Sequence, residues 1–174
     1  MNYTIQYNAI LNSIERRKKI FREIKTNPKY KELLDILNSN SSLNKEYVLL
    51  FRYYMLKYLP KTKKKKKLLD KTFLDSNNST LFKFLDKGEG TDFRPSGLIQ
   101  ICISLDLSYE ESFDLFMACG RNLTSDSPIT TICDKILKNF CKKSPDLDCL
   151  SRLIEINDYC EKNDFKNFIA KKPK

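Results

Sequence analysis

Apolar residues recur at helical spacing along most of this 174-residue chain, and no stretch alternates apolar and polar residues for long enough to predict a strand. The most regular series is Ile129, Ile132, Cys133, Ile136, Leu137 and Phe140. An apolar residue at every third or fourth position forms one stripe on a helix, and that stripe must be buried against another helix. The sequence therefore predicts an all-α fold, a helical bundle.

Short local motifs mark where these helices begin and end. Helix starts are predicted at Asn27 with Pro28, at Ser127 with Pro128, and at the capping box of Ser108 and Glu111. Gly120 is a natural helix end. The first helix is expected over about residues 4–25, and its polar side carries Arg16, Arg17, Lys18, Lys19 and Arg22.

Each predicted helix has a stripe that we expect to be buried. In the first helix the stripe is Tyr3, Tyr7, Ile10, Ile14, Phe21 and Ile24. The next stripes are Tyr47, Leu50, Phe51, Tyr54 and Tyr58, then Leu98, Ile99, Ile101, Cys102 and Leu105, then Phe113 and Phe116, and finally Leu153, Ile154 and Tyr159. We interpret the aromatic stripe from Tyr47 to Tyr58 as part of the hydrophobic core rather than as a platform on which nucleic-acid bases stack. Glu110, Glu111 and Asp114 are expected on a solvated helix face, and not as a catalytic carboxylate pair.

Composition removes several classes of active site. Histidine is absent, so the commonest general base and the usual Ser/His and Cys/His arrangements are missing. No glycine-rich phosphate loop occurs. Six cysteines form no Cys-x-x-Cys pair and are expected to be small buried apolar residues: Cys102, Cys119, Cys133, Cys141, Cys149 and Cys160. We therefore expect no metal site, no cofactor and no enzymatic activity.

The distribution of hydrophobic residues also bears on location. The first residues lack the apolar segment of a secretion signal, and no run of about 18 apolar residues could span a membrane. We expect a cytoplasmic protein with reduced thiols and no membrane partner.

Charge is unevenly distributed along this basic chain, whose formal net charge is +10. Residues 1–60 contain 11 basic and 5 acidic side chains, and residues 61–94 contain 10 and 5. The balance reverses to 3 and 6 over residues 95–140. This pattern fits a surface for a polyanion, although a solvated lysine-rich surface would have the same composition.

Residues 48–170 resemble small Firmicute and phage proteins with a λ-repressor/Cro-like (Xre-type) helix-turn-helix domain. The lysine-rich YMLKYLPKTKKKKKLLDK resembles their first and second helices, and STLFKFLDKG resembles the recognition helix and the loop after it. The most specific match is RPSGLIQICISLDLSYEESFDLFMACGRNL, because these proteins join helices four and five through a Leu-Gly-Leu-Ser-x-Glu-Glu pattern. The resemblance implies four parts: an N-terminal helical extension (1–42), the helix-turn-helix domain (43–120), C-terminal helices packed on it (121–170) and a disordered tail (171–174).

The resemblance also implies a function and a site. The chain would be a repressor-like, sequence-specific transcriptional regulator of bacterial or phage origin, acting in the cytoplasm of a bacterial cell. It would bind double-stranded DNA, as a homodimer on two half-sites. Phosphate contacts are expected from Lys63, Lys64, Lys66, Lys67 and Arg94, and base-edge contacts from Asn77, Asn78, Thr80 and Lys83.

Departures from the family pattern favour a second hypothesis. Phe73 stands near the family's glycine before the recognition helix, Asp106 replaces the glycine between helices four and five, and the loop 86–93 is long and acidic. A retained scaffold of this kind could instead be a protein-binding module, for example a phage or mobile-element inhibitor of a host nucleic-acid-processing or defence complex. Its partner would present an acidic or nucleic-acid-binding surface.

Overall fold

A computed structural model of the chain describes residues 3–38, 45–58, 95–125, 127–141 and 149–165, and every regular element in these ranges is a helix. In chain order the elements are α1 (Tyr3–Thr26), the 3-10 helix η1 (Pro28–Leu33), α2 (Leu34–Asn38), α3 (Lys45–Tyr58), α6 (Pro95–Ser104), α7 (Tyr109–Ala118), α8 (Pro128–Phe140) and α9 (Cys149–Lys162). The prediction of an all-α fold is confirmed. The predicted domain boundaries stay a prediction.

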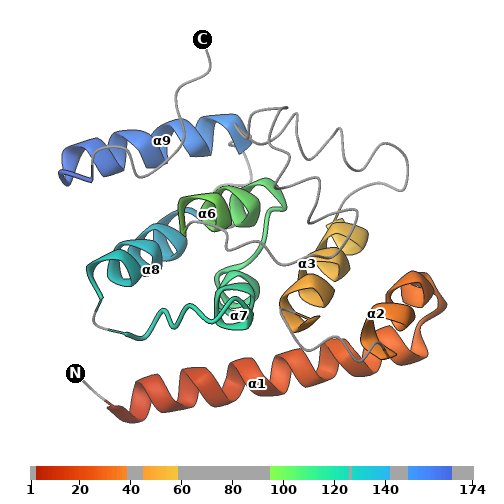
Figure 1. Cartoon of the computed structure of the whole chain (residues 1–174). Coiled ribbons are helices and arrows are strands. Elements are labelled where there is room, and N and C mark those ends of the chain that lie inside the picture. Colours follow the sequence, from red (N-terminus) through yellow and green to blue (C-terminus); the bar gives the residue numbers. More distant parts are fainter. Residues whose placement is uncertain (1–2, 39–44, 59–94, 126, 142–148, 166–174) are drawn as a thin grey trace.

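The helices are arranged between two outer ones (Figure 1). Helix α1 lies along one side of the molecule and α9 along the opposite side, with α3, α6, α7 and α8 between them. Helix α1 packs against η1, α3 and α7, whereas α6 packs against α8 and α9. Buried side chains from α1 through α9 form one hydrophobic core. The N-terminal helix is therefore an integral part of this core.

The core is built mainly on α3 and α6. In α3, the predicted stripe residues Tyr47, Leu50, Phe51 and Tyr54 are buried, so its interpretation as core is confirmed, and Tyr58 is half-buried. Every residue of α6 from Leu98 to Ser104 is buried, including Gln100. A helix that is buried on all sides has no solvent-facing stripe, which explains why α6 contains no charged residue.

The junction between α6 and α7 forms as the capping signals predicted. Asp106 has a φ of 55°, in the left-handed region, and the backbone N–H of Leu107 donates to the Cys102 carbonyl at 3.0 Å. This is the Schellman arrangement, in which a left-handed residue ends a helix. The Ser108 side chain then caps α7, and Glu111 completes the capping box. Aspartate tolerates the left-handed conformation better than most residues, so it can replace glycine here.

Several burial predictions for individual residues are wrong. Tyr3 and Tyr7 were expected in the buried stripe of α1 but are exposed, because the helices that cover its C-terminal half do not cover this end. Ile129, in the first turn of α8, and Ile154 of α9 are also exposed. Ser127 precedes α8 as predicted, but its side chain makes no capping hydrogen bond. Periodicity identifies a helix more reliably than it identifies how far the stripe is covered.

The predicted role of the cysteines is confirmed where the structure describes their side chains. Cys102, Cys133, Cys141 and Cys160 are buried free thiols, and Cys119 is half-buried. Burial raises the pKa of Cys133 to about 12 and the pKa of Cys141 to about 11. These thiols stay protonated at neutral pH and behave as core residues.

Within the described ranges, no helix is long and apolar enough to cross a membrane.

The left-handed conformation at Asp106 predicts an ordered response to substitution. Asp106→Asn, Asp106→Gly and Asp106→Val all remove the ion pair between Asp106 and Arg152, whose closest atoms are 2.8 Å apart. Asparagine and glycine accept a positive φ, whereas the β-branched valine does not. We expect the valine variant to be less stable than the asparagine variant by about 1–2 kcal/mol in urea unfolding. Equal stability of the three variants would contradict a left-handed residue here.

Candidate nucleic-acid interface

The residues predicted to contact DNA lie outside the described ranges. They are Lys63, Lys64, Lys66, Lys67, Asn77, Asn78, Thr80, Lys83 and Arg94. The described chain reaches Tyr58 on one side of them and resumes at Pro95 on the other. Their roles stay a prediction. The described basic surface is formed by other residues of the N-terminal half, mainly on α1.

Helix α1 is held against α7 by an ion pair with two hydrogen bonds. Arg16 Nε donates to Asp114 Oδ2 at 2.8 Å, and Arg16 Nη2 donates to Asp114 Oδ1 at 2.7 Å. Asp114 has only 1% of its side chain exposed, so its prediction as a solvated residue is wrong. Burial raises the pKa of Asp114, and the hydrogen bonds from Arg16 oppose that shift. Paired and doubly hydrogen-bonded, the buried carboxylate has the partner that it requires.

The next residue, Arg17, is also directed inward. Its side chain is buried, and Nη1 donates to Glu46 Oε1 of α3 at 2.7 Å. Two consecutive arginines thus connect α1 to two different helices, α7 and α3. These two contacts could not be predicted from the sequence, because Asp114 and Glu46 are far from both arginines along the chain. The polar side predicted for α1 is therefore smaller than expected.

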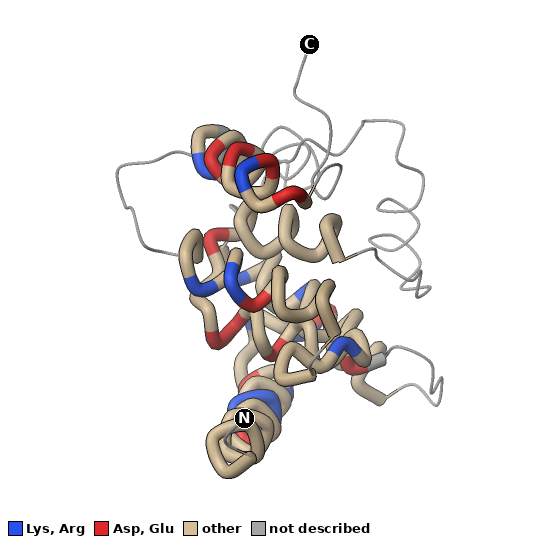
Figure 2. Tube along the Cα trace, turned by 90° about the vertical axis from the view of Figure 1, so that its left-hand side faces the viewer, with Lys and Arg blue, Asp and Glu red and all other residues tan. Residues whose placement is uncertain are grey.

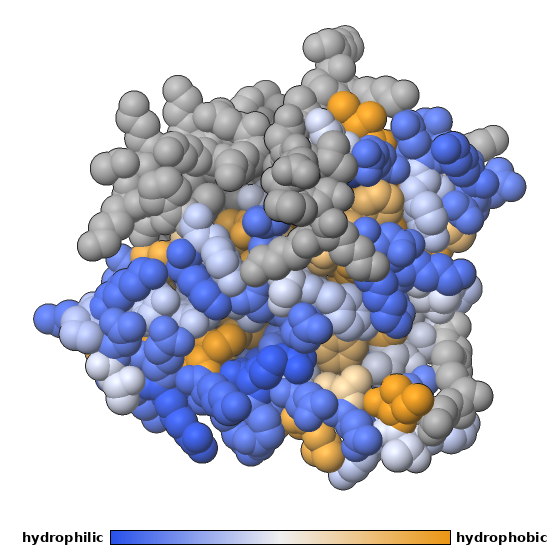
Figure 3. Space-filling model, turned by 180° about the vertical axis from the view of Figure 1, so that it is seen from behind, coloured by the Kyte–Doolittle hydropathy of each residue, from blue (hydrophilic) through white to orange (hydrophobic). Residues whose placement is uncertain are grey.

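Four further cations form an exposed strip on α1, which we call the basic strip: Lys18, Lys19, Arg22 and Lys25. They span seven helical steps, or about 10 Å. Lys18 pairs with Glu15 at 2.8 Å, but the other three make no ion pair with any residue that the structure describes. Seen from behind in Figure 3, the C-terminal part of α1 presents a continuous hydrophilic surface. The strip therefore carries four exposed cations with one ion-paired acidic neighbour, Glu15.

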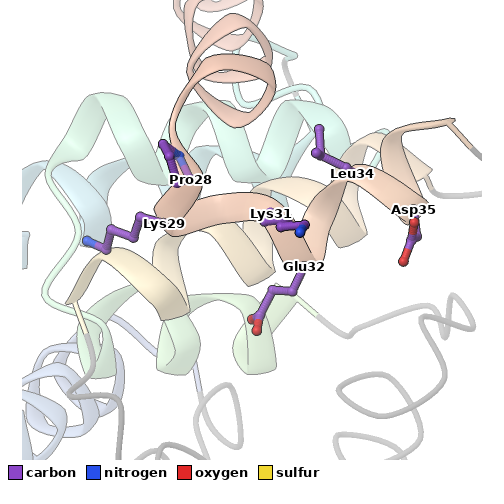
Figure 4. Close-up of a pocket in the computed structure, with 6 residues that line it drawn as sticks. All are labelled: Pro28, Lys29, Lys31, Glu32, Leu34 and Asp35. Carbon is purple, nitrogen blue, oxygen red and sulfur yellow. The ribbon is translucent and has the colours of Figure 1, made fainter.

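The strip does not continue as a concentrated positive surface into η1. A shallow hollow of about 520 Å³ follows there, lined by Pro28, Lys29, Lys31, Glu32, Leu34 and Asp35. Figure 4 shows that these side chains point in different directions and do not converge on one point. Lys29 lies over the Tyr30 ring, 5.3 Å from its centroid. With two lysines and two carboxylates around its rim, the hollow is not an anion site.

A hydrogen-bond network connects the C-terminal end of α3 to the start of α7. Glu111 Oε1 accepts from the Tyr58 hydroxyl at 2.5 Å and from Lys57 Nζ at 3.0 Å, while Glu111 Oε2 accepts from the Ser108 backbone N–H at 3.0 Å. Burial would raise the pKa of Glu111, but these hydrogen bonds outweigh burial and lower it. The carboxylate stays ionised at neutral pH. Its hydrogen bonds with Lys57 and Tyr58 attach the C-terminal end of α3 to α7, and the predicted lysine run follows α3 in the sequence. Sequence reasoning identified Glu111 as a capping residue but missed its two partners in α3.

The two outer helices differ in net charge, although both carry acidic and basic residues (Figure 2). In α9, the exposed acidic residues Glu155, Asp158 and Glu161 outnumber the exposed Lys162, and this helix lies on the side of the molecule opposite α1. A polyanion would be attracted to the α1 side and repelled from the α9 side. The described surface therefore has a preferred orientation toward a negatively charged partner.

A metal ion requires several ligating side chains close together. In the described part of the chain, no group of three or more histidine, cysteine, aspartate or glutamate residues could hold a metal ion. Comparison of the chain with protein-family models, curated proteins and solved structures finds no match.

Removal of Arg16 should reveal how much α1 depends on Asp114. Arg16→Met leaves the Asp114 carboxylate buried without its partner, so we expect the free energy of unfolding to fall by about 3 kcal/mol. Arg22→Met removes an exposed arginine from the same helix and should change it by less than about 0.5 kcal/mol. Urea unfolding of both variants measures the difference. Equal effects would show that the ion pair does not anchor α1.

Proposed function

We propose that this chain is a DNA-binding protein that contacts phosphates through the basic strip of α1. The observation that supports the proposal is that neighbouring cations of α1 lie in different environments. Arg16 and Arg17 are neutralised within the fold, whereas Lys19, Arg22 and Lys25 face solvent without an acidic partner in the described ranges. Cations that stabilise the fold lie inside, and those left on the surface are free to bind a polyanion.

The resemblance to Xre-type proteins extends this proposal to regulation. A repressor-like protein would read base edges through residues 77–83, which the resemblance places around the recognition helix, while Lys63 to Lys67 and the basic strip would bind phosphates. The Schellman turn at Asp106 and the capping box of Ser108 support such a scaffold, because they form the tight junction that the resemblance places between helices four and five. A homodimer and a cytoplasmic location belong to the same proposal.

A second candidate function is favoured by a different observation. The N-terminal half of α1 exposes several large apolar side chains, among them Tyr3, Ile5 and Tyr7. Exposed apolar residues grouped on one helix are typical of protein-binding surfaces. A protein-binding module would use this surface together with the basic strip to hold a partner that has an acidic or nucleic-acid-binding surface.

Charge reversal in the basic strip tests the DNA proposal. Arg22→Glu/Lys25→Glu should weaken binding to duplex DNA by more than tenfold at low salt and reduce the slope of log K against log salt by roughly 2, because each phosphate contact contributes about 0.9 to the slope. The matched control is Lys135→Glu/Lys162→Glu, which makes the same charge change at exposed residues of α8 and α9. Fluorescence anisotropy at several salt concentrations measures both quantities.

The outcome separates a defined surface from a general charge effect. Equal loss in the two double variants would mean that net charge alone attracts the DNA, and salt-independent affinity of the unchanged protein would contradict phosphate contact. If either result is obtained, capture of a stoichiometric protein partner after nuclease treatment would support the protein-binding module instead.

The part of the proposal that rests on the resemblance has its own test. Lys64→Glu/Lys66→Glu should weaken binding to all duplexes alike, because phosphate contacts carry no sequence information. Lys83→Ala should instead reduce the preference for the protein's own promoter over an unrelated duplex, as expected for a base-edge contact worth about 1–3 kcal/mol. Mobility shifts at two salt concentrations compare these variants. An unchanged preference in Lys83→Ala would contradict its role in base recognition.

A further inference from the structure

The first half of α1 differs in charge from the rest of this basic protein. Residues 3–14, which we call the neutral stretch, contain no charged side chain, whereas 31% of the whole chain is charged. Its exposed apolar side chains are Tyr3 (81% exposed), Ile5 (66%), Tyr7 (62%) and Leu11 (41%). Figure 3 shows apolar surface at the lower right, where the N-terminal part of α1 lies, beside the hydrophilic surface of the rest of the molecule. Interface cores are depleted of charge and enriched in tyrosine in this way.

The spacing of α1 indicates that another helix should cover this surface. Residues at alternating intervals of four and three form one continuous seam: Tyr3, Tyr7, Ile10, Ile14, Arg17, Phe21 and Ile24. Within the same chain, Arg17 and Ile24 are buried and Phe21 is half-buried. The seam is thus covered at its C-terminal end, while Tyr3 and Tyr7 at its N-terminal end are exposed.

A groove runs beside the exposed end of the seam. Its volume is about 570 Å³, and it is lined by Tyr3, Thr4, Gln6, Tyr7, Ile10, Asn122 and Thr124. The lining combines aromatic and aliphatic surface with amide and hydroxyl groups, and includes no charged side chain. A fitting occupant would be a helix that carries apolar side chains, tyrosine hydroxyls and amides. The neutral stretch itself has this composition, so the surface is complementary to a second copy.

We propose that the neutral stretch is the interface of a symmetric homodimer, in which two α1 helices pack antiparallel across a two-fold axis near Tyr7. A two-fold interface uses the same patch on both subunits and therefore requires self-complementarity. Nucleic acid and acidic partners gain nothing from a surface without cations. The dimer gives the oligomer expected in the proposed function a defined surface, but it requires no DNA.

Electrostatics selects the antiparallel arrangement. In a parallel pair, each basic strip would face its copy across a distance shorter than the Debye length of about 8 Å. In the antiparallel pair, Lys18 begins its strip 11 residues beyond Tyr7, about 16 Å along the helix. The two strips then start about 33 Å apart along the dimer, where salt screens their repulsion. The charge-free segment is the part of α1 that can pair with its copy at little electrostatic cost.

The size of the surface predicts a weak dimer. Two tyrosines bury roughly 300–500 Å² per subunit when they are fully covered, and a standard stable interface buries about 800 Å² per partner. We therefore expect a dimer that forms in the micromolar range or above, visible as a concentration-dependent mass.

Analytical ultracentrifugation of the full chain over a concentration series, without DNA, tests the proposal. Tyr7→Glu places two carboxylates against each other at the two-fold axis and should weaken dimerisation by at least tenfold. Asn12→Glu adds the same charge to an exposed residue of the same stretch, but roughly 140° round the helix from Tyr7. We expect this control to dimerise like the unchanged protein, and circular dichroism checks that both variants are folded. A monomer at every concentration, or equal weakening by the two variants, would overturn the proposal.

Cysteine cross-linking tests the arrangement of the two helices. Helix axes packed at 8–10 Å bring facing Cα atoms within disulfide range, so Tyr7→Cys should cross-link to its copy when a thiol oxidant is added. Asn12→Cys and the unchanged protein, with its native cysteines, should not. Cross-linking at both Tyr3→Cys and Tyr7→Cys with similar yield would indicate parallel helices and refute the two-fold axis at Tyr7. Binding to anionic vesicles by a protein that remains monomeric would likewise overturn the dimer. None of these results depends on DNA, so loss of the dimer and loss of DNA binding are distinguishable.

Discussion

The buried carboxylate of Asp114 is the constraint on which the placement of α1 depends. A carboxylate with 1% exposure needs a cation and hydrogen bonds, and Arg16 supplies both through two donors. The pair need not add much net stability, since burying the two charges is itself costly. Its main effect is geometric: a planar guanidinium that bonds both carboxylate oxygens allows α1 one rotation about its axis. The ion pair of Arg17 with Glu46 selects the same rotation from the side of α3.

The position of the basic strip follows from that rotation. With Arg16, Arg17 and Ile24 on the inner side, the four cations of the basic strip are necessarily on the outer side of the same helix. Position along the axis has a separate effect: the first two turns lie beyond the helices that cover the C-terminal half, so Tyr3 and Tyr7 remain exposed. The buried pair therefore determines which side of α1 carries the basic strip, whereas the length of α1 beyond its neighbours leaves the apolar end uncovered.

Local signals in the sequence predicted the parts of the fold that depend on neighbouring residues. The Ser108 capping box, the helix end at Gly120 and the buried stripe of α3 each arise within a few residues, and each has the predicted form. Asp114 could not be predicted as buried, because its partner lies 98 positions away along the chain and only the packing of α1 on α7 brings them together. Exposure of Tyr3 is non-local for the same reason: its apolar character is the same whether or not another helix covers it. The predicted DNA contacts from Lys63 to Arg94 lie outside the described ranges and remain predictions of the resemblance.

The two proposed surfaces of α1 are compatible, and helix geometry shows how. On a straight helix the seam drifts by about 20° per heptad, and Leu11 lies beside it. Counting about 100° per residue, Tyr3, Tyr7 and Leu11 are therefore centred roughly 100° round the helix from the buried Arg17 and Ile24, and the basic strip is centred roughly 50° further on. A two-fold axis perpendicular to an antiparallel pair returns each face to the same side of the dimer. Both basic strips would then face one side, with the two helical bodies and their acidic α9 helices directed away from it. A single DNA duplex could then contact both basic strips of one dimer. Once the first strip is bound, binding of the second is intramolecular, so the dimer would bind DNA more tightly than one strip alone. DNA binding would in turn favour the dimer over the monomer.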